Sequence, residues 1–164
     1  MRILITGTNG EIGKEIANIL AENKKYKLGL LSNKKNKINA NSFYQNLLKP
    51  IKLQFKPQII IHCAAKHPNS KTGSDMKNIY LTNIKITKNL INFANKNDVK
   101  KVFFLSSIAA YGQIRKEIID EKQKPIDQNL YERSKFESEK LFCKKKNKFQ
   151  TVCLRIPGVF TTNL

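Results

Sequence analysis

The chain has 164 residues, the length of one domain with a real core, because chains of this size bury roughly 70% of the surface that they expose when unfolded. Hydrophobic residues make up 40% of the chain and charged residues 26%, with 7 Gly and 5 Pro, which excludes disordered and fibrous proteins. No segment approaches the ~20 apolar residues that span a bilayer, and the first apolar run is too short for a signal peptide. We therefore expect a cytoplasmic protein without a membrane partner.

The net charge of +19 comes from 31 basic and 12 acidic residues, and such a charge ordinarily indicates a nucleic-acid or membrane partner. Here 27 of the basic residues are Lys, spread along the chain among many Asn and Ile, a mixture that codon bias in an AT-rich genome produces. Arg, the usual reader of bases, occurs four times. We predict no specific nucleic-acid partner, and a nucleic-acid-binding protein stays an alternative that rests on net charge alone.

The cysteines are three, an odd number, and form no C-x-x-C pair, so we expect the thiols of Cys63, Cys143 and Cys153 to be reduced. His62 and His67 lie too far from any cysteine pair to complete a local tetrahedral zinc site. We therefore expect no metal, and we interpret His62 as a structural histidine and His67 as a surface loop residue.

Short apolar runs alternate with longer amphipathic stretches, which is the pattern of βαβ units around a parallel sheet. The apolar runs hold β-branched and aliphatic residues in succession, as expected of strands that helices cover on both faces. We predict strands at residues 2–6, 27–31, 59–63, 102–105 and 151–155.

The amphipathic stretches predict helices at residues 10–23, 75–96 and 129–145. Ser74 or Asp75 can cap the second of them. Two prolines interrupt residues 33–58, where we expect a small strand near Ile38 and a helix at 42–48.

The alternation of predicted strands and helices indicates an α/β fold. No repeat, low-complexity tract or linker divides the chain, so we predict one domain over residues 1–164. We expect a Rossmann-like, doubly wound parallel sheet in three α/β/α layers.

A glycine-rich segment, Thr6-Gly7-Thr8-Asn9-Gly10-Glu11-Ile12-Gly13, follows the first predicted strand directly and opens the first predicted helix. Glycine is needed here because one residue turns tightly off the strand, one lets the backbone approach a pyrophosphate, and one lets the helix pack on the sheet. The N–H groups and the positive end of the helix dipole then face the phosphates. We predict that residues 7–13 bind the phosphates of a dinucleotide; the alternative is a glycine turn without a ligand.

The end of the second predicted strand bears on the choice between NAD and NADP. An acid about 20 residues past the glycines would bind the ribose 2′-hydroxyl, whereas a basic site suits the 2′-phosphate of NADP. No acid follows this strand; Ser32 and Asn33 can donate hydrogen bonds, and Lys34 or Lys35 can pair with a phosphate. NADP is therefore the preferred cofactor and NAD the alternative. The alternative interpretation is that Lys34 and Lys35 belong to the general excess of lysine along the chain and bind no phosphate.

A serine pair and a tyrosine–lysine pair accompany the fourth predicted strand. Ser106 and Ser107 follow its carboxyl end, and Tyr131 and Lys135 are four residues apart in a predicted helix, so the phenol and the ammonium share one face. A nearby cation favours the phenolate and moves the tyrosine pKa from near ~10 toward the range of a general acid or base. Lysine can also donate to ribose hydroxyls, and a serine here can hydrogen-bond a reacting hydroxyl or carbonyl.

These segments together resemble the extended short-chain dehydrogenase/reductases, the NAD-dependent epimerase/dehydratase family. The G-x-x-G-x-x-G, Ser-Ser-x-x-x-Tyr-Gly and Tyr-x-x-x-Lys segments follow in the family's order. Residues 60–65 resemble its H-x-A-A strand end beside the cofactor, residues 83–87 its N-x-x-x-T helix, and residues 154–160 its L-R-x-x-x-V-Y segment beside the nicotinamide.

The resemblance implies roles for individual residues. Tyr131 would be the acid/base, Lys135 would lower its pKa and hold the ribose, and Ser107 would orient the substrate. Asn83 would support the proton relay, unless it is an ordinary helix residue, and Tyr111 would be a packing residue or a substrate-side contact. The further cofactor-binding residues that it implies are Cys63, Ala64, Ala65 and Pro157, together with Tyr131 and Lys135.

The resemblance covers only the first half or so of the family, whose members continue into a substrate-binding part. It therefore implies the cofactor-binding portion of a nucleotide-sugar epimerase, dehydratase or reductase, with the substrate-binding domain absent. A homodimer is one arrangement that would cover the apolar surface left exposed. Residues 38–41 also lack the acid that the family carries after its third strand. The alternative is a non-enzymatic dinucleotide-binding module or a remnant.

Overall fold

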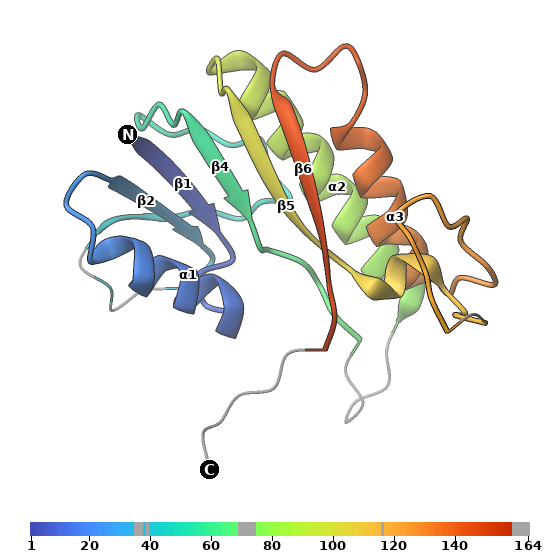
Figure 1. Ribbon diagram of the computed structural model, residues 1–164. Coiled ribbons are helices and arrows are strands. Elements are labelled where there is room, and N and C mark those ends of the chain that lie inside the picture. Colours follow the sequence, from blue (N-terminus) through green and yellow to red (C-terminus); the bar gives the residue numbers. More distant parts are fainter. Residues whose placement is uncertain (35–37, 39, 69–74, 116, 159–164) are drawn as a thin grey trace.

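The computed structural model describes residues 1–34, 38, 40–68, 75–115 and 117–158. These residues form six parallel strands in the order β3-β2-β1-β4-β5-β6 (Figure 1). The strands are β1 (Arg2–Thr6), β2 (Lys27–Ser32), β3 (Asn41–Tyr44), β4 (Ile59–His62), β5 (Lys101–Ser107) and β6 (Gln150–Ile156). The helices are α1 (Glu11–Ala21), α2 (Met76–Lys96), α3 (Leu130–Phe142) and a 3₁₀ helix, η1 (Ile108–Tyr111). The predicted α/β fold is confirmed.

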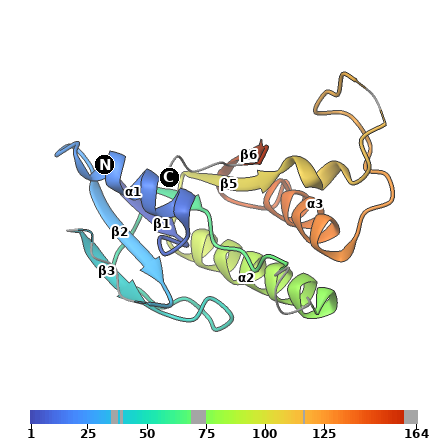
Figure 2. The ribbon, with the colours of Figure 1, turned by 90° about the horizontal axis from the view of Figure 1, so that it is seen from below.

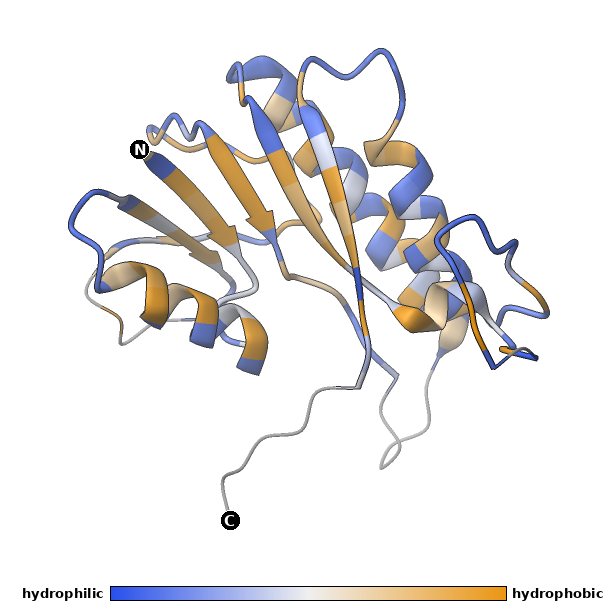
Figure 3. Cartoon of the chain, in the orientation of Figure 1, coloured by the Kyte–Doolittle hydropathy of each residue, from blue (hydrophilic) through white to orange (hydrophobic). Residues whose placement is uncertain are grey.

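Helices lie on both sides of the sheet (Figures 1 and 2). α1 covers one face near β1 and β2, whereas α2 and α3 pack against each other on the opposite face. Alternation of side chains along the strands explains this arrangement: Ile3 and Ile5 of β1 share a core cluster with Ala17 of α1, while Leu4 shares the larger cluster with Leu90 of α2. Figure 3 shows the central strands apolar along most of their length, as burial on both faces requires.

The segment after β2 differs from the prediction. The third strand is β3 and not a strand near Ile38, and the predicted helix at 42–48 is wrong. β3 pairs in parallel with the edge of β2, and this pairing overrides the weak helical preference of so short a segment. The loop that follows is held by Asn89 of α2, whose Nδ2 donates to the carbonyls of Leu47 at 2.8 Å and Lys49 at 3.2 Å.

The predicted helices at 10–23, 75–96 and 129–145 are confirmed, with ends within three residues of the predicted limits. The Asp75 side chain caps α2; Ser74, the other candidate cap, lies outside the described residues. Asn129 caps α3, and the Glu132 carboxylate accepts a hydrogen bond from the Asn129 N–H at 2.8 Å, which completes a capping box. The start of α3 is therefore fixed just before Tyr131.

The strand order reverses in the middle of the sheet, because β1 has β2 on one side and β4 on the other. Ligands of open α/β sheets bind at the carboxyl ends of the strands at such a switch point. The loops that follow β1 and β4 lie there, so the fold brings the glycine segment beside the H-x-A-A segment.

The outer part of the sheet keeps some apolar surface. On the α1 side, no described helix packs over β5 and β6 (Figure 1), and Leu154 of β6 is 43% exposed. None of the helices in the described ranges is long and apolar enough to cross a membrane.

Candidate functional site

The glycines of the loop after β1 have distinct packing roles. Gly7 has a left-handed φ of 75°, and a Cβ added there would lie 2.6 Å from the Ala64 backbone nitrogen. A Cβ added to Gly13 would lie 2.4 Å from the Gly7 carbonyl oxygen, whereas one on Gly10 meets nothing nearer than that oxygen at 3.4 Å. Packing therefore requires Gly7 and Gly13, while Gly10 leaves room for a ligand to approach the backbone.

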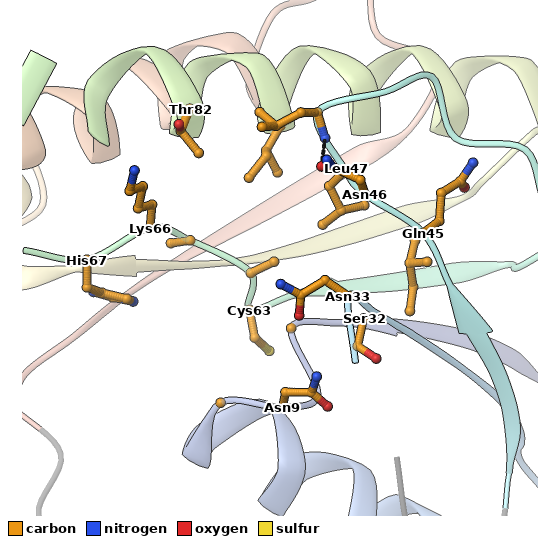
Figure 4. Close-up of a pocket in the computed structure, with 17 residues that line it drawn as sticks. Asn9, Ser32, Asn33, Gln45, Asn46, Leu47, Cys63, Lys66, His67 and Thr82 are labelled. Carbon is orange, nitrogen blue, oxygen red and sulfur yellow. Dashed lines mark hydrogen bonds between the residues drawn. The ribbon is translucent and has the colours of Figure 1, made fainter. Parts of the chain in front are cut away.

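Two adjoining cavities of about 430 and 500 Å³ follow the carboxyl ends of the strands, and each has the size of a small-molecule site. Figure 4 shows the first, with Asn9, Ser32 and Asn33 near the start of α1 and the end of β2, and His67 in the loop after β4. The residues that line both cavities are Gly7, Gly10, Cys63 and His67. The cavities therefore form one groove across the glycine loop.

This groove gathers most of the predicted binding residues. The first cavity is lined by Gly7, Asn9, Gly10, Ser32, Asn33, Cys63, Ala64 and Ala65. The second is lined by Gly7, Gly10, Glu11, Ile12, Gly13, Cys63, Ser107, Tyr131, Lys135 and Pro157. Thr8 and Lys34 line neither cavity: Thr8 is buried, and the Lys34 carbonyl accepts hydrogen bonds from Ser32 Oγ at 2.5 Å and Asn9 Nδ2 at 3.3 Å.

The segment after β3 also lines the first cavity, and sequence reasoning missed it because it placed the third strand too early. The contributing residues are Gln45, Asn46, Leu47 and Leu48. None of them is an acid, so the predicted absence of an acid holds for the segment that follows the actual third strand.

His62, at the end of β4, is a structural residue, as predicted. It is 1% exposed, and its Nδ1 lies 2.7 Å from the Thr6 hydroxyl of β1. Burial, assisted by the positive charge of Lys135, lowers the pKa of His62 to about 3. Its imidazole is therefore neutral at physiological pH and ties β4 to β1 beneath the glycine loop.

Lys135 and Tyr131 reach the second cavity from one face of α3, as their spacing predicts. Lys135 Nζ donates to the Leu105 carbonyl at 3.0 Å, and burial lowers the pKa of this ammonium to about 8. Burial raises the pKa of Tyr131, so the expected lowering is not met in this structure. The Lys135 ammonium is bound to β5, while the Tyr131 hydroxyl lies 3.0 Å from Nδ1 of His67.

Ser107 and Tyr111 have structural contacts of their own. Ser107 Oγ accepts a hydrogen bond from the Ala109 N–H at 3.1 Å and so caps η1 at the wall of the second cavity. Tyr111 is buried, donates to the Asp120 carbonyl, and packs under Arg155 at 4.3 Å from ring centroid to guanidinium carbon. Tyr111 lines neither cavity, so its packing role is supported.

Asn83 of α2 holds the loop after β4 and lines neither cavity. Its Oδ1 accepts from the Lys66 N–H at 2.7 Å, and its Nδ2 donates to the Lys66 carbonyl at 3.1 Å and to Ser134 Oγ at 3.0 Å. Ser134 in turn donates to the Tyr131 carbonyl at 2.6 Å. Asn83 therefore joins this loop to the helix that carries Tyr131.

Sequence reasoning missed Glu139, which lies one turn beyond Lys135 on α3. Its carboxylate is buried, accepts a hydrogen bond from Ser106 of β5 at 2.5 Å, and pairs with Arg155 of β6 at 2.7 Å. The i, i+4 spacing from Lys135 was the signal that could have identified it. Within the described part of the chain, no three His, Cys, Asp or Glu side chains gather in a way that could hold a metal ion.

Comparisons with known proteins agree with this geometry. The family model "NAD dependent epimerase/dehydratase family" matches residues 3–163. The chain is 32% identical to a UDP-glucose 4-epimerase of Halalkalibacterium halodurans (94% of this chain, 50% of that protein) and 31% identical to one of Mycoplasma genitalium (96% and 52%). It thus spans about half the length of these curated relatives.

Solved structures share the fold. A UDP-glucose 4-epimerase from Brucella ovis, in complex with NAD, has a TM-score of 0.83 at 23% identity, over 94% of this chain and 51% of that one. The family match covers nearly the whole chain and agrees with the order of its segments. The chain therefore belongs to the NAD-dependent epimerase/dehydratase family.

Proposed function

We propose that this chain is the dinucleotide-binding, catalytic-residue-bearing portion of an enzyme that acts on a nucleotide sugar. The observation that carries the proposal is the continuous groove, which begins beside Ser32 and Asn33, crosses the glycine loop and ends at Tyr131 and Lys135. Its middle fits a pyrophosphate, because Gly10 presents backbone without a side chain there. Its relatives act on UDP-sugars, as their names state, which supports a UDP-sugar as the substrate class.

The cofactor in this proposal is a nicotinamide dinucleotide. The Brucella ovis structure was solved with NAD, which supports the class of cofactor. The preference for NADP over NAD stays a prediction that rests on Ser32, Asn33 and Lys34, among which there is no carboxylate to bind a ribose 2′-hydroxyl. Asn33→Asp supplies that carboxylate without a change of shape, so it should move the affinity ratio toward NAD.

The residues at the far end of the groove suit acid/base and positioning roles. The bound nicotinamide would supply the hydride chemistry. Tyr131 would take the proton of a sugar hydroxyl at its phenol oxygen and return it. Lys135 uses one N–H on Leu105 and keeps two for ribose hydroxyls, while the Ser107 hydroxyl proton is free to orient the reacting oxygen, because its oxygen caps η1 as an acceptor.

Titration calorimetry and thermal unfolding of the 164-residue chain with NAD and NADP test the proposal. At a hundredfold excess over the dissociation constant, the bound cofactor should stabilise the fold by about 2.7 kcal/mol. Tyr131→Phe should leave this affinity nearly unchanged, whereas Lys135→Met should weaken it. The absence of heat with both dinucleotides, or equal effects of the two substitutions, would contradict the proposal.

A dinucleotide-binding module without turnover is the second candidate, because the groove can hold a dinucleotide whether or not a reaction follows. An assay of UDP-glucose and UDP-galactose interconversion with saturating cofactor separates the two. Turnover that Tyr131→Phe abolishes supports the enzyme, and cofactor binding without turnover supports the module.

A further inference from the structure

The contact between Tyr131 and His67 joins two elements that are 64 residues apart in sequence. Tyr131 Oη and His67 Nδ1 are separated by 3.0 Å, and the ring centroids by 5.5 Å with the planes tilted by 47°. His67 lines both cavities, so it stands where the two halves of the groove meet. The residue interpreted from sequence as a surface loop residue thus contacts the proposed acid/base directly.

The loop that carries His67 is fixed by the helices around it. Asn83 binds both the N–H and the carbonyl of Lys66, the residue before His67. The same Asn83 contacts Ser134, which donates to the Tyr131 carbonyl. The two rings are therefore positioned by one hydrogen-bond network centred on Asn83, and their approach does not depend on the His67 side chain alone.

The direction of the hydrogen bond follows from the state of each group. Burial, with the positive charge of Lys135, lowers the pKa of His67, and burial raises the pKa of Tyr131, so at neutral pH the imidazole is neutral and the phenol keeps its proton. A neutral imidazole has one acceptor nitrogen and one donor nitrogen. When the proton of the neutral ring is on Nε2, Nδ1 accepts from the phenol, and this tautomer is the one that we assign to His67.

We propose that His67 is a positioning residue that holds the Tyr131 hydroxyl in the groove and carries its proton to solvent. The proton is conserved at each step: as the phenol takes the proton of the sugar hydroxyl, its own O–H bond breaks and an N–H bond forms at Nδ1, and the imidazolium then releases its Nε2 proton to water. The return of a proton to the sugar runs the same path in reverse and restores the ring to the tautomer protonated on Nε2. The role rests on the proposed function, since it serves Tyr131 as acid/base. The other titratable groups that line the second cavity are Glu11 of α1, Cys63 after β4 and Lys135 of α3; of these, Lys135 acts on the pKa of His67.

The chain offers a clean spectroscopic test, because it contains two histidines and His62 has its pKa near 3. NMR of histidine-labelled protein between pH 5 and 8 therefore follows His67 alone. Donation by the phenol stabilises the neutral imidazole, so Tyr131→Phe should lower the acid dissociation constant of His67 by up to about tenfold. Tyr80→Phe is the matched control, because the Tyr80 hydroxyl contacts Glu137 and it should leave His67 unchanged.

The opposite sign overturns the proposal. If Nδ1–H of His67 donated to the phenol oxygen, Tyr131→Phe would raise the acid dissociation constant of His67, and nitrogen chemical shifts would place the proton of the neutral ring on Nδ1. An unchanged titration would also reject the contact. Asn83→Ala, which releases Lys66 without touching either ring, should move the titration in the same direction as Tyr131→Phe.

These results are separable from the proposed function. The titration needs neither cofactor nor turnover, so a chain that binds no dinucleotide can still show the predicted shift. Conversely, dinucleotide binding with the wrong sign in the titration would leave the proposed function standing and remove the relay. In an active preparation, His67→Asn, which offers a hydrogen-bonding group but cannot carry a proton, should change the pH profile of turnover.

Discussion

Glu139 of α3 accepts a hydrogen bond from each of two nitrogens of Arg155 on β6, from Nη2 to Oε2 at 2.7 Å and from Nε to Oε1 at 3.0 Å. Ser106 of β5 donates to the same carboxylate. The buried Glu139 carboxylate thus joins strands β5 and β6 to α3, the helix that carries Tyr131 and Lys135. Glu139 lies one helical turn after Lys135.

Arg155→Gln should destabilise the fold by about 3 kcal/mol, because it leaves the buried Glu139 carboxylate without its cation. Arg133→Gln is the matched control: Arg133 pairs with Glu137 on the exposed side of α3, where solvent screens the ion pair, so the loss of stability should be much smaller. Urea unfolding measures both. Similar losses of unfolding free energy in the two variants would show that the buried pair stabilises the fold no more than the exposed pair does.

Two glycine substitutions should separate folding from binding. Gly13→Ala places a methyl group 2.4 Å from the Gly7 carbonyl oxygen, so it should destabilise the chain and lower its yield. Gly10→Ala has a compatible φ of −83° and open space, so it should change stability by less than about 1 kcal/mol while it weakens dinucleotide affinity. Thermal unfolding and calorimetry test this; full affinity in Gly10→Ala would place the phosphates elsewhere.

Lys135 should make the fold more stable at alkaline pH. Its pKa falls from 10.5 to about 8 on folding, so between these values the unfolded chain binds a proton that the folded chain lacks, and stability rises with pH. Lys135→Met should remove this rise and stabilise the fold by about 1–3 kcal/mol at pH 7. Lys88→Met, at an exposed position on α2, should leave the urea-unfolding profile unchanged.

His62 should make the fold sensitive to mild acid. Its pKa is lowered from 6.5 to about 3, so the unfolded chain binds an extra proton between these values, and stability is lost as pH falls through this window. Between pH 7 and pH 5 the wild type should lose about 2 kcal/mol more than His62→Gln, in which the Thr6 hydroxyl keeps an acceptor. Parallel losses in both proteins would assign the acid sensitivity to carboxylates.

The parts of the fold that local pattern determines were predictable. The strands of the central sheet are continuous apolar runs, and Asp75 and Asn129 mark helix starts by their own side chains. β3 could not be predicted, because its extended form depends on pairing with the edge of β2, and local sequence patterns do not reveal that pairing.

The candidate site shows the same division. Gly7, Gly10 and Gly13 were identified from their spacing, and Tyr131 and Lys135 share a face as expected. His67 carried no local signal, because its contact with Tyr131 exists only once the loop after β4 meets α3. The pKa of Tyr131 was expected to fall because a cation lies four residues away in the helix. In the structure burial raises this pKa, and Lys135 donates to the Leu105 carbonyl, neither of which the sequence reveals.

The packing of α2 against α3 has a consequence for the interpretation of mutants. Helix α3 carries Tyr131, Lys135 and Glu139, and Asn83 of the neighbouring helix α2 contacts the loop of His67. The hydroxyls of Thr87 on α2 and Ser138 on α3 are 2.9 Å apart at the interface between the two helices. Substitutions at this interface will move all of these groups together. A variant with altered packing at this interface will lose turnover as if a catalytic group had been removed, although none of the substituted atoms lies near a substrate.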